Sequence, residues 1–369
     1  MAFEKPVVVL DHGSYIMKAG FACDNHPVSM FRTLVGRPNY LKGTYGREYY
    51  DVFIGDEAEA RIDDLELCSP VVNGQIVHWD NMERIWHHVF YRELKAAPED
   101  RSVMMACDNC STMEEKIKCC EIFFEVLNSP GLCIQSQSVL AMYGSGFTTG
   151  ICVDIGYDTT DVNPVFEGGM IKYAHIQTGL AGAQISNYVK RSLVERNLAH
   201  GIKTPKDIDD ILRNQLYITP DCAMPRNNYK RSVNSACGEA IDLTNEAFMA
   251  GEMFFQPDFV MGEKTNYIPL HDAVLTASLK CDSELRPELY DAIVPCGGFA
   301  MVPGMNERLQ IELENLIHRP VTISSSTEAY AVVWLGGATF AGLPDAKKLW
   351  VTRKQYEEHG FKIIKNKFM

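Results

Sequence analysis

The sequence predicts an α/β protein of two domains. Apolar, strand-like runs alternate along the chain with amphipathic, helix-like segments, which is the pattern of α/β layers. The chain has 369 residues, 46% of them hydrophobic, and is longer than one hydrophobic core usually sustains. Two strand-like runs end in similar phrases, "LDHGSY" at 10–15 and "VDIGYDTT" at 153–160. A repeated Asp-x-Gly at a strand end indicates one hairpin device used twice.

Composition excludes several classes of protein. The net charge of −13 disfavours direct binding to nucleic acid, since phosphate backbones attract clustered Lys and Arg. No apolar run approaches the ~20 residues of a membrane span, and the start "MAFEKP" has no signal-peptide core. The 12 cysteines, without such a signal, indicate reduced thiols. We therefore expect a soluble protein of the cytoplasm or nucleus that binds neither membrane nor nucleic acid.

The first elements are a strand and a hairpin. Residues 7–12 are predicted to form a buried strand, and "YIMKAGFA" at 15–22 returns beside it. Residues 28–55 are predicted to be loop-rich, because glycines, charges and tyrosines gather there.

A helix is predicted for "WDNMERIWHHVFYRELK" at 79–95. Asp80 with Glu83 resembles a capping box at its start. His87 and His88 adjoin its apolar stripe, and we interpret them as packed or solvated helix residues rather than ligands. The stripe consists of Met82, Ile85, Trp86, Val89 and Phe90.

A cysteine cluster follows, between the predicted strands "SVMMAC" and "GLCIQSQ". Cys107 and Cys110 have the spacing of a zinc knuckle, but Cys119 and Cys120 are adjacent and no histidine lies close in sequence. Neighbouring helical residues diverge by about 100°, so these two thiols would not easily face one metal ion. We favour small buried hydrophobic residues, with zinc as the alternative.

The second half repeats the strand and hairpin pattern. "TTGICVDIG" and "DVNPVFEGG" predict a second hairpin, and helices are predicted near 182–197 and 205–214. Later, "AIVPCGGFAMVPGM" predicts a strand that enters a glycine-rich turn, followed by the helix "MNERLQIELENLI". No Pro- or Ser-rich linker separates the domains, so we expect them to contact each other closely.

The two hairpins suit phosphate and a divalent cation. A glycine at a hairpin turn lets the backbone approach a ligand, and successive N–H groups there bind anions. Ser14 adds a hydroxyl and Lys18 a positive charge, while Asp11 and Asp154 would face each other across a cleft and hold a cation with waters. The pair Gly297 and Gly298 would let backbone lie against a base or sugar. Together these features predict a two-lobed nucleotide clamp.

Several segments resemble actin. They are "GDEA" at 55–58, "WDNMERIWHHVFYREL" at 79–94, "SVLAMYGSGFTTGI" at 138–151, "MFFQPDF" at 253–259, "KCDSELRPELYDAIV" at 280–294 and "VVWLGGATFAGL" at 332–343. The resemblance covers nearly the whole chain and is closest to a divergent actin-related protein. It implies the two-lobed fold shared by actin, hexokinase and heat-shock chaperone ATPases. The first lobe would comprise 1–140 with 332–369, with a small subdomain inserted at about 33–70, and the second 141–331, with an insertion at about 182–256.

The resemblance also implies the site residues and the cofactor, ATP or ADP with Mg²⁺. Gln137 would position the attacking water, and Asp11 and Asp154 would hold Mg²⁺ through waters. The nucleotide-binding set would be Asp11, Gly13, Ser14, Lys18, Asp154, Gly156, Thr159, Gly182, Gly297, Gly298 and Met301.

Departures from the family pattern concentrate in this site. Tyr15 and Asp158 replace glycines of the two phosphate loops, and a carboxylate near phosphates costs affinity. Asp161 stands where actins carry a histidine that helps to order the attacking water. The nucleoside contacts also change, at Leu212, Arg213, Val302 and Tyr330, although Arg213 and Tyr330 could stack on a base. The resemblance therefore implies compromised hydrolysis, at most a very slow ATPase.

The contacts that build actin filaments have changed as well. The loop at 39–50 reads "NYLKGTYGREYY", the plug segment at 261–272 is more polar at its start, and Asn73 replaces a histidine that is methylated in actins. The groove where actins bind partner helices would consist of Tyr143, Gly146, Thr148, Phe340 and Leu343. Simple packed surface residues explain that set equally well.

These changes favour a structural subunit of a larger cytoskeletal or motor-associated assembly, in the cytoplasm, with a ciliary or nuclear site as an alternative. Its partners would be other proteins, including actin or actin-related subunits. The alternatives are a filament-forming ATP switch, a chromatin-complex subunit and a sugar-kinase-like enzyme.

Overall fold

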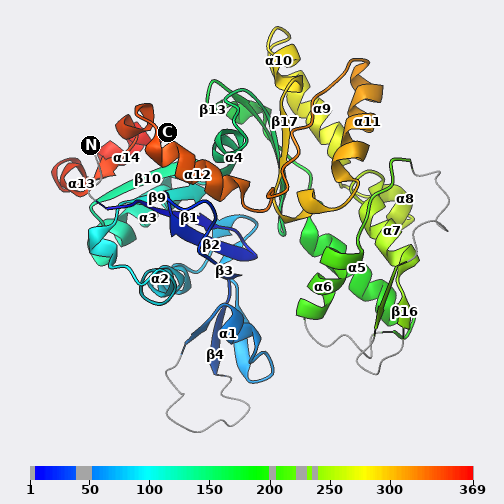
Figure 1. The fold of residues 1–369 in the computed structure, drawn as a ribbon, viewed down its shortest axis with the longest axis horizontal. Coiled ribbons are helices and arrows are strands. Elements are labelled where there is room, and N and C mark those ends of the chain that lie inside the picture. The colour runs from blue at the N-terminus through cyan, green and yellow to red at the C-terminus, as the bar shows by residue number, and fades with distance from the viewer. Residues whose placement is uncertain (1–4, 39–51, 199–204, 222–230, 235–239, 369) are drawn as a thin grey trace. The chain divides into compact units, whose positions relative to one another are not determined.

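The computed structural model describes residues 5–38, 52–198, 205–221, 231–234 and 240–368 (Figure 1). The chain divides into two compact units. Unit 1 comprises Met1–Phe147 and Ala331–Met369, and unit 2 comprises Thr148–Tyr330. Each unit combines a β-sheet with helices, so the predicted α/β fold class is confirmed. No helix in the described ranges is long and apolar enough to span a membrane.

The main sheet of unit 1 confirms the first predicted strand and hairpin. Strand β1 (Val8–His12) pairs in parallel with β9 (Val103–Cys107) and antiparallel with β2 (Ile16–Phe21). Every residue of β1 and β9 is buried, as their central place requires. The sheet runs, in order, through β18 (Val351–Thr352), β10 (Gly131–Ser136), β9 (Val103–Cys107), β1 (Val8–His12), β2 (Ile16–Phe21) and β3 (Ser29–Arg32).

The prediction of a loop-rich segment at 28–55 is wrong for its first part. Residues Ser29–Arg32 form β3, in which buried Ser29 and Phe31 alternate with exposed Met30. Their pairing with β2 stabilises a strand that the local composition did not predict. Strands β4 (Val35–Pro38), β5 (Phe53–Ile54) and β6 (Leu65–Cys68) form a second, small sheet beside α1 (Asp56–Glu59), and β7 (Val71–Val72) pairs with β8 (Gln75–Ile76). The loop at 39–50 lies outside the described residues.

The predicted helix at 79–95 is confirmed as α2 (Trp79–His88) with a π-helical continuation at Val89–Glu93. Its apolar stripe is fully buried. The capping-box prediction is wrong, because the N-cap is His78 and Asp80 already lies in the first turn. There its negative charge still favours the helix N-terminus. His87 and His88 lie 3.8 and 3.1 Å from Glu83 and Glu93.

The cysteine helix is α3 (Met113–Glu121), which begins with a capping box between Thr112 and Glu115. Cys119 and Cys120 are buried, and burial raises the pKa of both thiols. Within the described ranges, no three His, Cys, Asp or Glu side chains are grouped so as to hold a metal ion. The other α-helices of unit 1 are α4 (Gln137–Gly144), α12 (Val332–Gly342), α13 (Arg353–His359) and α14 (Phe361–Lys367).

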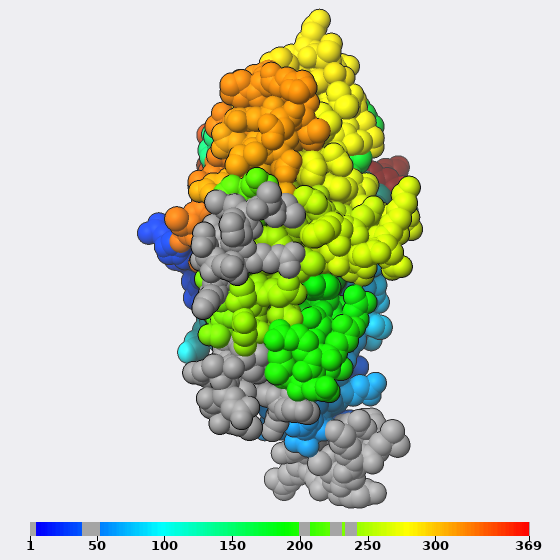
Figure 2. Space-filling view, turned by 90° about the vertical axis from the view of Figure 1, so that its right-hand side faces the viewer, coloured from blue at the N-terminus to red at the C-terminus, as the bar shows by residue number. Residues whose placement is uncertain are grey.

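Unit 2 confirms the second predicted hairpin, formed by β11 (Gly150–Ile155) and β12 (Thr160–Phe166). Its sheet contains β13 (Gly169–Met170), β12 (Thr160–Phe166), β11 (Gly150–Ile155) and β17 (Ile293–Cys296), with β14 (Ile176–Gln177) also paired to β12. The predicted helices near 182, 205 and 305 are confirmed as α5 (Gly182–Glu195), α6 (Pro205–Gln215) and α11 (Met305–Ile317). The remaining elements are β15 (Ser232–Asn234), β16 (Ala240–Asp242), α7 (Thr244–Glu252), α8 (Pro257–Met261), α9 (Leu270–Lys280) and α10 (Arg286–Tyr290). Figure 2 shows the face on which α11, in orange, and the green α5–α6 region reach the surface.

A buried ion pair links three segments of unit 2. Arg308 on α11 is 1% exposed and donates to Glu252 at 2.9 Å and to Glu312 at 2.6 Å. It also donates to the carbonyl oxygen of Thr219 at 3.1 Å. Each charged group is thus paired, as burial of charge requires.

Unit 1 contains a buried histidine at the end of β1. His12 is 5% exposed, and its ring meets Trp86 edge-on, with 6.4 Å between ring centroids. Burial lowers the pKa of His12 to about 4, although the nearby charge of Asp11 acts in the opposite direction. The imidazole is therefore neutral at pH 7.

This lowered pKa predicts acid sensitivity of unit 1. The unfolded chain, with a histidine pKa of about 6.5, binds the proton more readily than the folded state does. The contribution of His12 to the stability of unit 1 is thus fully present above pH 6.5 and is lost as the pH falls toward 4. Between pH 7 and pH 5 the loss due to His12 should be about 2 kcal/mol.

Urea unfolding at both pH values tests this, because all four tryptophans, Trp79, Trp86, Trp334 and Trp350, lie in unit 1 and report on it. Between pH 7 and pH 5, His12→Asn should lose about 2 kcal/mol less stability than the wild type loses. His359→Asn, on a side chain 56% exposed, is the matched control. An equal loss in wild type and His12→Asn would show that another group is responsible.

Candidate functional site

The two predicted hairpins share one backbone geometry. A Cβ atom at Gly13 would lie 2.9 Å from the carbonyl oxygen of Ile16, and one at Gly156 would lie 2.9 Å from that of Thr159. In both loops the glycine therefore approaches the carbonyl three residues later, too closely for a side chain. In each hairpin the aspartate is the next-to-last residue of its strand and lies two residues before this glycine. The hairpins are equivalent in form.

In the first hairpin the aspartate is balanced by a cation. Asp11, 2% exposed, lies directly opposite Lys18 in the β1–β2 register. The Lys18 Nζ donates to Asp11 Oδ2 at 2.7 Å, and Gln137 Nε2 donates to Oδ1 at 3.2 Å. Unit 1 thus brings three predicted site residues together. Since an ammonium group has three donors, Lys18 can contact a phosphate without leaving Asp11.

The rest of this loop is tied to neighbouring segments. Thr33 Oγ1 donates to the Gly13 carbonyl at 2.7 Å, and Ser69 Oγ donates to the Ser14 carbonyl at 3.3 Å. Arg32 stacks over the Tyr15 ring, 3.4 Å from its centroid, and also donates to its hydroxyl. The same guanidinium pairs with Glu59 at 2.8 Å. Arg32 therefore connects Tyr15 to Glu59.

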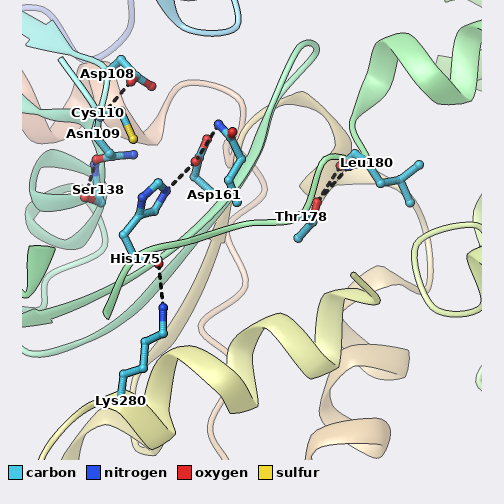
Figure 3. A network of polar contacts seen from close by, with 10 residues as sticks. Asp108, Asn109, Cys110, Ser138, Asp161, His175, Thr178, Leu180 and Lys280 are labelled. Carbon is cyan, nitrogen blue, oxygen red and sulfur yellow. Dashed lines mark hydrogen bonds and ion pairs between the residues drawn. The ribbon is translucent and has the colours of Figure 1, made fainter. Parts of the chain in front are cut away.

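In the second hairpin the aspartate faces another aspartate. Asp154 lies directly opposite Asp161, which places both side chains on one face of the sheet. Asp161 is 3% exposed, and its Oδ1 accepts from His175 Nε2 at 2.7 Å and from Gln177 Nε2 at 3.3 Å. Figure 3 shows the first of these bonds, together with the bond from Lys280 Nζ to the His175 carbonyl at 3.5 Å. His175 and Gln177 were not among the residues predicted from the sequence.

The loop of the second hairpin is held by the start of α5. The backbone N–H of Gly182 donates to the Gly156 carbonyl at 3.1 Å, and that of Ala183 donates to the Tyr157 carbonyl at 2.7 Å. These two amides therefore position the loop. Asp158 and Thr159 are half-buried within it.

The glycine pair after β17 lies beside Asp154. Gly297 has φ +87°, and a Cβ there would lie 2.7 Å from Asp154 Oδ1 and 2.5 Å from the Ile155 carbonyl oxygen. Only glycine fits this approach. A Cβ at Gly298 would meet no atom within 4 Å, so this residue borders open space, and Met301 is 41% exposed. Unit 2 thus groups Asp154, Gly156, Gly297 and Gly298.

The predicted nucleoside contacts differ in accessibility. Leu212 is buried in the core of unit 2 and cannot contact a ligand from there. Arg213 is exposed, and Val302 and Tyr330 are half-buried.

The predicted partner groove is divided between the units. Tyr143, Gly146, Phe340 and Leu343 belong to unit 1, and Thr148 belongs to unit 2. Phe340 is 4% exposed and meets the half-buried Tyr143 edge-on, with 5.2 Å between centroids. The Phe340 ring therefore packs against Tyr143 and has little exposed surface that a partner could contact. Binding of partners at these residues stays a prediction.

The comparison with protein families bears on the whole chain. The model of the family described as Actin matches residues 3–233 and 206–369. Its matched segments contain both hairpins, the glycine pair after β17 and all the predicted site residues. The resemblance inferred from short segments is thereby confirmed, and the chain belongs to the actin family.

Proposed function

We propose that this protein is a docking subunit of a larger cytoskeletal assembly and that it holds a magnesium nucleotide as a structural ligand. The observation that carries the nucleotide proposal is the equivalence of the two hairpin loops around Gly13 and Gly156. Members of the actin family typically bind nucleotide with Mg²⁺. Asp11, Lys18 and Gln137 in unit 1, and Asp154 with the glycines in unit 2, supply suitable charges and close backbone.

The docking role rests on the altered filament contacts. The loop at 39–50 combines lysine, arginine and tyrosines in place of an apolar tip. In the plug segment, Thr265 donates its N–H and its hydroxyl to Asp258 Oδ1, each at 2.7 Å, which ties the segment to α8. A homopolymer requires two surfaces of one chain that fit each other. Since both surfaces differ from those of actin, we place the protein in assemblies built with other chains.

Nucleotide binding predicts a thermal shift. Ligand at 100 times its Kd stabilises the folded state by about 2.7 kcal/mol, so Mg-ATP should raise the melting temperature by several degrees. Asp154→Asn should reduce the shift, and removal of Mg²⁺ with EDTA should abolish it. Asp158→Gly should enlarge it, because the loop then presents one negative charge fewer to the phosphates.

The matched control is Asp345→Asn, at a side chain that is 99% exposed. Mg-ATP should raise the melting temperature of this variant as much as that of the wild type. A wild type that does not respond to Mg-ATP, combined with a responsive Asp158→Gly, would show a closed, vestigial site.

The altered surfaces also predict that the purified protein does not polymerise. Under salt conditions and concentrations in which conventional actin sediments as filaments, it should remain in the supernatant. The reason is the loss of apolar pairing between the loop at 39–50 and the plug segment. Long filaments in negative-stain micrographs would favour the filament-forming alternative.

Docking through the groove predicts a selective loss of partners. Tyr143→Ala removes the aromatic ring that Phe340 supports, and proteins recovered with the wild type by affinity purification should be depleted at least severalfold. Tyr91→Ala, at another tyrosine that is 54% exposed, is the matched control. Equal recovery with both variants would place docking elsewhere on the surface.

A further inference from the structure

The C-terminal part of the chain has a charge opposite to that of the rest. Residues 344–369 contain seven Lys or Arg and three Asp or Glu, a net charge of +4. The other residues contain 28 Lys or Arg and 45 Asp or Glu, a net charge of −17. A basic segment on an acidic protein is a candidate surface for an anionic partner.

Most of this positive charge lies on helix α14 (Figure 1). The basic residues of α13 are balanced, since Arg353 lies 3.0 Å from Glu357 and Lys354 lies 3.8 Å from Glu358. Helix α14, in contrast, contains three lysines and no acidic residue. The surplus of this region is therefore concentrated on one short helix.

Helix α14 is fixed to unit 1 through its inner face. Ile364 and the C-cap residue Phe368 are buried in the core of that unit. Lys116 Nζ donates to the Phe368 carbonyl at 2.9 Å, and Lys367 Nζ donates to Gln355 Oε1 at 3.1 Å. These contacts determine which face of α14 is turned toward solvent.

The outer face of α14 carries an aromatic ring and two lysines. Phe361 is 47% exposed, and Lys362 and Lys365 are exposed as well. Lys365 follows Phe361 by four residues and Lys362 by three, so the three side chains are neighbours on one helical face. In the part of the chain that the structure describes, neither lysine forms a hydrogen bond or an ion pair. Both ammonium groups can therefore bind a carboxylate without giving up a contact inside the protein.

Phe361 packs on a stack of aromatic rings. Its ring lies edge-on to Tyr356, with 6.5 Å between centroids, and Tyr356 is stacked on Phe124 at 4.8 Å. Tyr356 is buried and donates its hydroxyl to Glu125 at 2.7 Å. Because these contacts hold the exposed ring in place, an apolar side chain that binds there has little ordering left to impose.

We propose that the outer face of α14, formed by Phe361, Lys362 and Lys365, binds an acidic segment of a partner protein. The segment places an apolar side chain on Phe361 and carboxylates beside the two lysines. This inference rests on the proposed docking role and adds the chemistry of the partner and the place where it binds.

The range of electrostatic forces favours a peptide segment over larger anions. At physiological ionic strength, exposed charges act over about 8 Å. A segment that lies along a helix of seven residues stays within about this range of the lysines. A membrane or a nucleic acid extends well beyond it and meets the acidic remainder of the chain. Two exposed lysines also attract an anionic membrane only weakly.

Fluorescence anisotropy with a dye-labelled synthetic peptide, in which glutamates flank two leucines, tests this proposal. Lys362→Gln/Lys365→Gln should bind it about tenfold more weakly than the wild type, because two exposed ion pairs are lost. Phe361→Ala should bind it about fivefold more weakly, because an apolar contact is lost. Added salt should weaken the binding of the wild type, since exposed charges are screened.

The matched control is Lys172→Gln/Lys190→Gln, which removes two exposed lysines from unit 2. Its affinity for the peptide should equal that of the wild type. The same peptide with glutamines in place of the glutamates should bind the wild type about tenfold more weakly. Melting temperatures establish that each variant is folded, and the lysine variant decides the question if Phe361→Ala is not.

Equal affinity of the wild type and Lys362→Gln/Lys365→Gln, or of the two peptides, would overturn this inference. A wild type that ignores the peptide would overturn it too, in favour of a membrane if the lysine variant loses binding to phosphatidylserine vesicles, or of a second copy if that variant loses self-association in sedimentation. In these cases, depletion of copurifying proteins by Tyr143→Ala leaves the docking role standing. A wild type that copurifies with no protein would overturn both.

Discussion

The charge around each hairpin aspartate depends on the residue that lies directly opposite it on the neighbouring strand. In unit 1 it is Lys18, whose ammonium group neutralises Asp11 at 2.7 Å. In unit 2 it is Asp161, so two carboxylates oppose each other and His175 lies next to them. The same hairpin geometry therefore places a lysine opposite one aspartate and a second aspartate opposite the other.

The sequence was sufficient to predict features governed by local rules. Both hairpins, the stripe of α2 and the helix at 305–317 follow from periodicity and from glycine at tight turns. Features governed by pairing between distant segments were missed. Strand β3 forms because β2 lies beside it, although its own residues resemble a loop. The start of α2 was misplaced because a polar residue with an acidic residue three positions later occurs within helices as well as at their ends.

The same reason explains why His175 was missed. It adjoins β14, a strand of only two residues, and nothing in its local sequence indicates that it reaches Asp161. The contact exists because Gln177 pairs with Asp161 across the sheet. Candidate residues such as Asp11 and Gly156 could be found from short motifs. The residues that determine how those groups act come from strand pairing, which a single sequence does not reveal.

Departures from the family pattern occur together with local partners. Tyr15 is stacked under Arg32, which also holds Glu59. Asn73, with φ 50°, and Gly74, with φ 78°, form the two-residue turn between β7 and β8, which requires left-handed backbone at both positions. Asp161 has His175 and Gln177. Considered singly, each substitution suggests the loss of a function. Considered with its neighbours, each of these three substitutions fits its local surroundings.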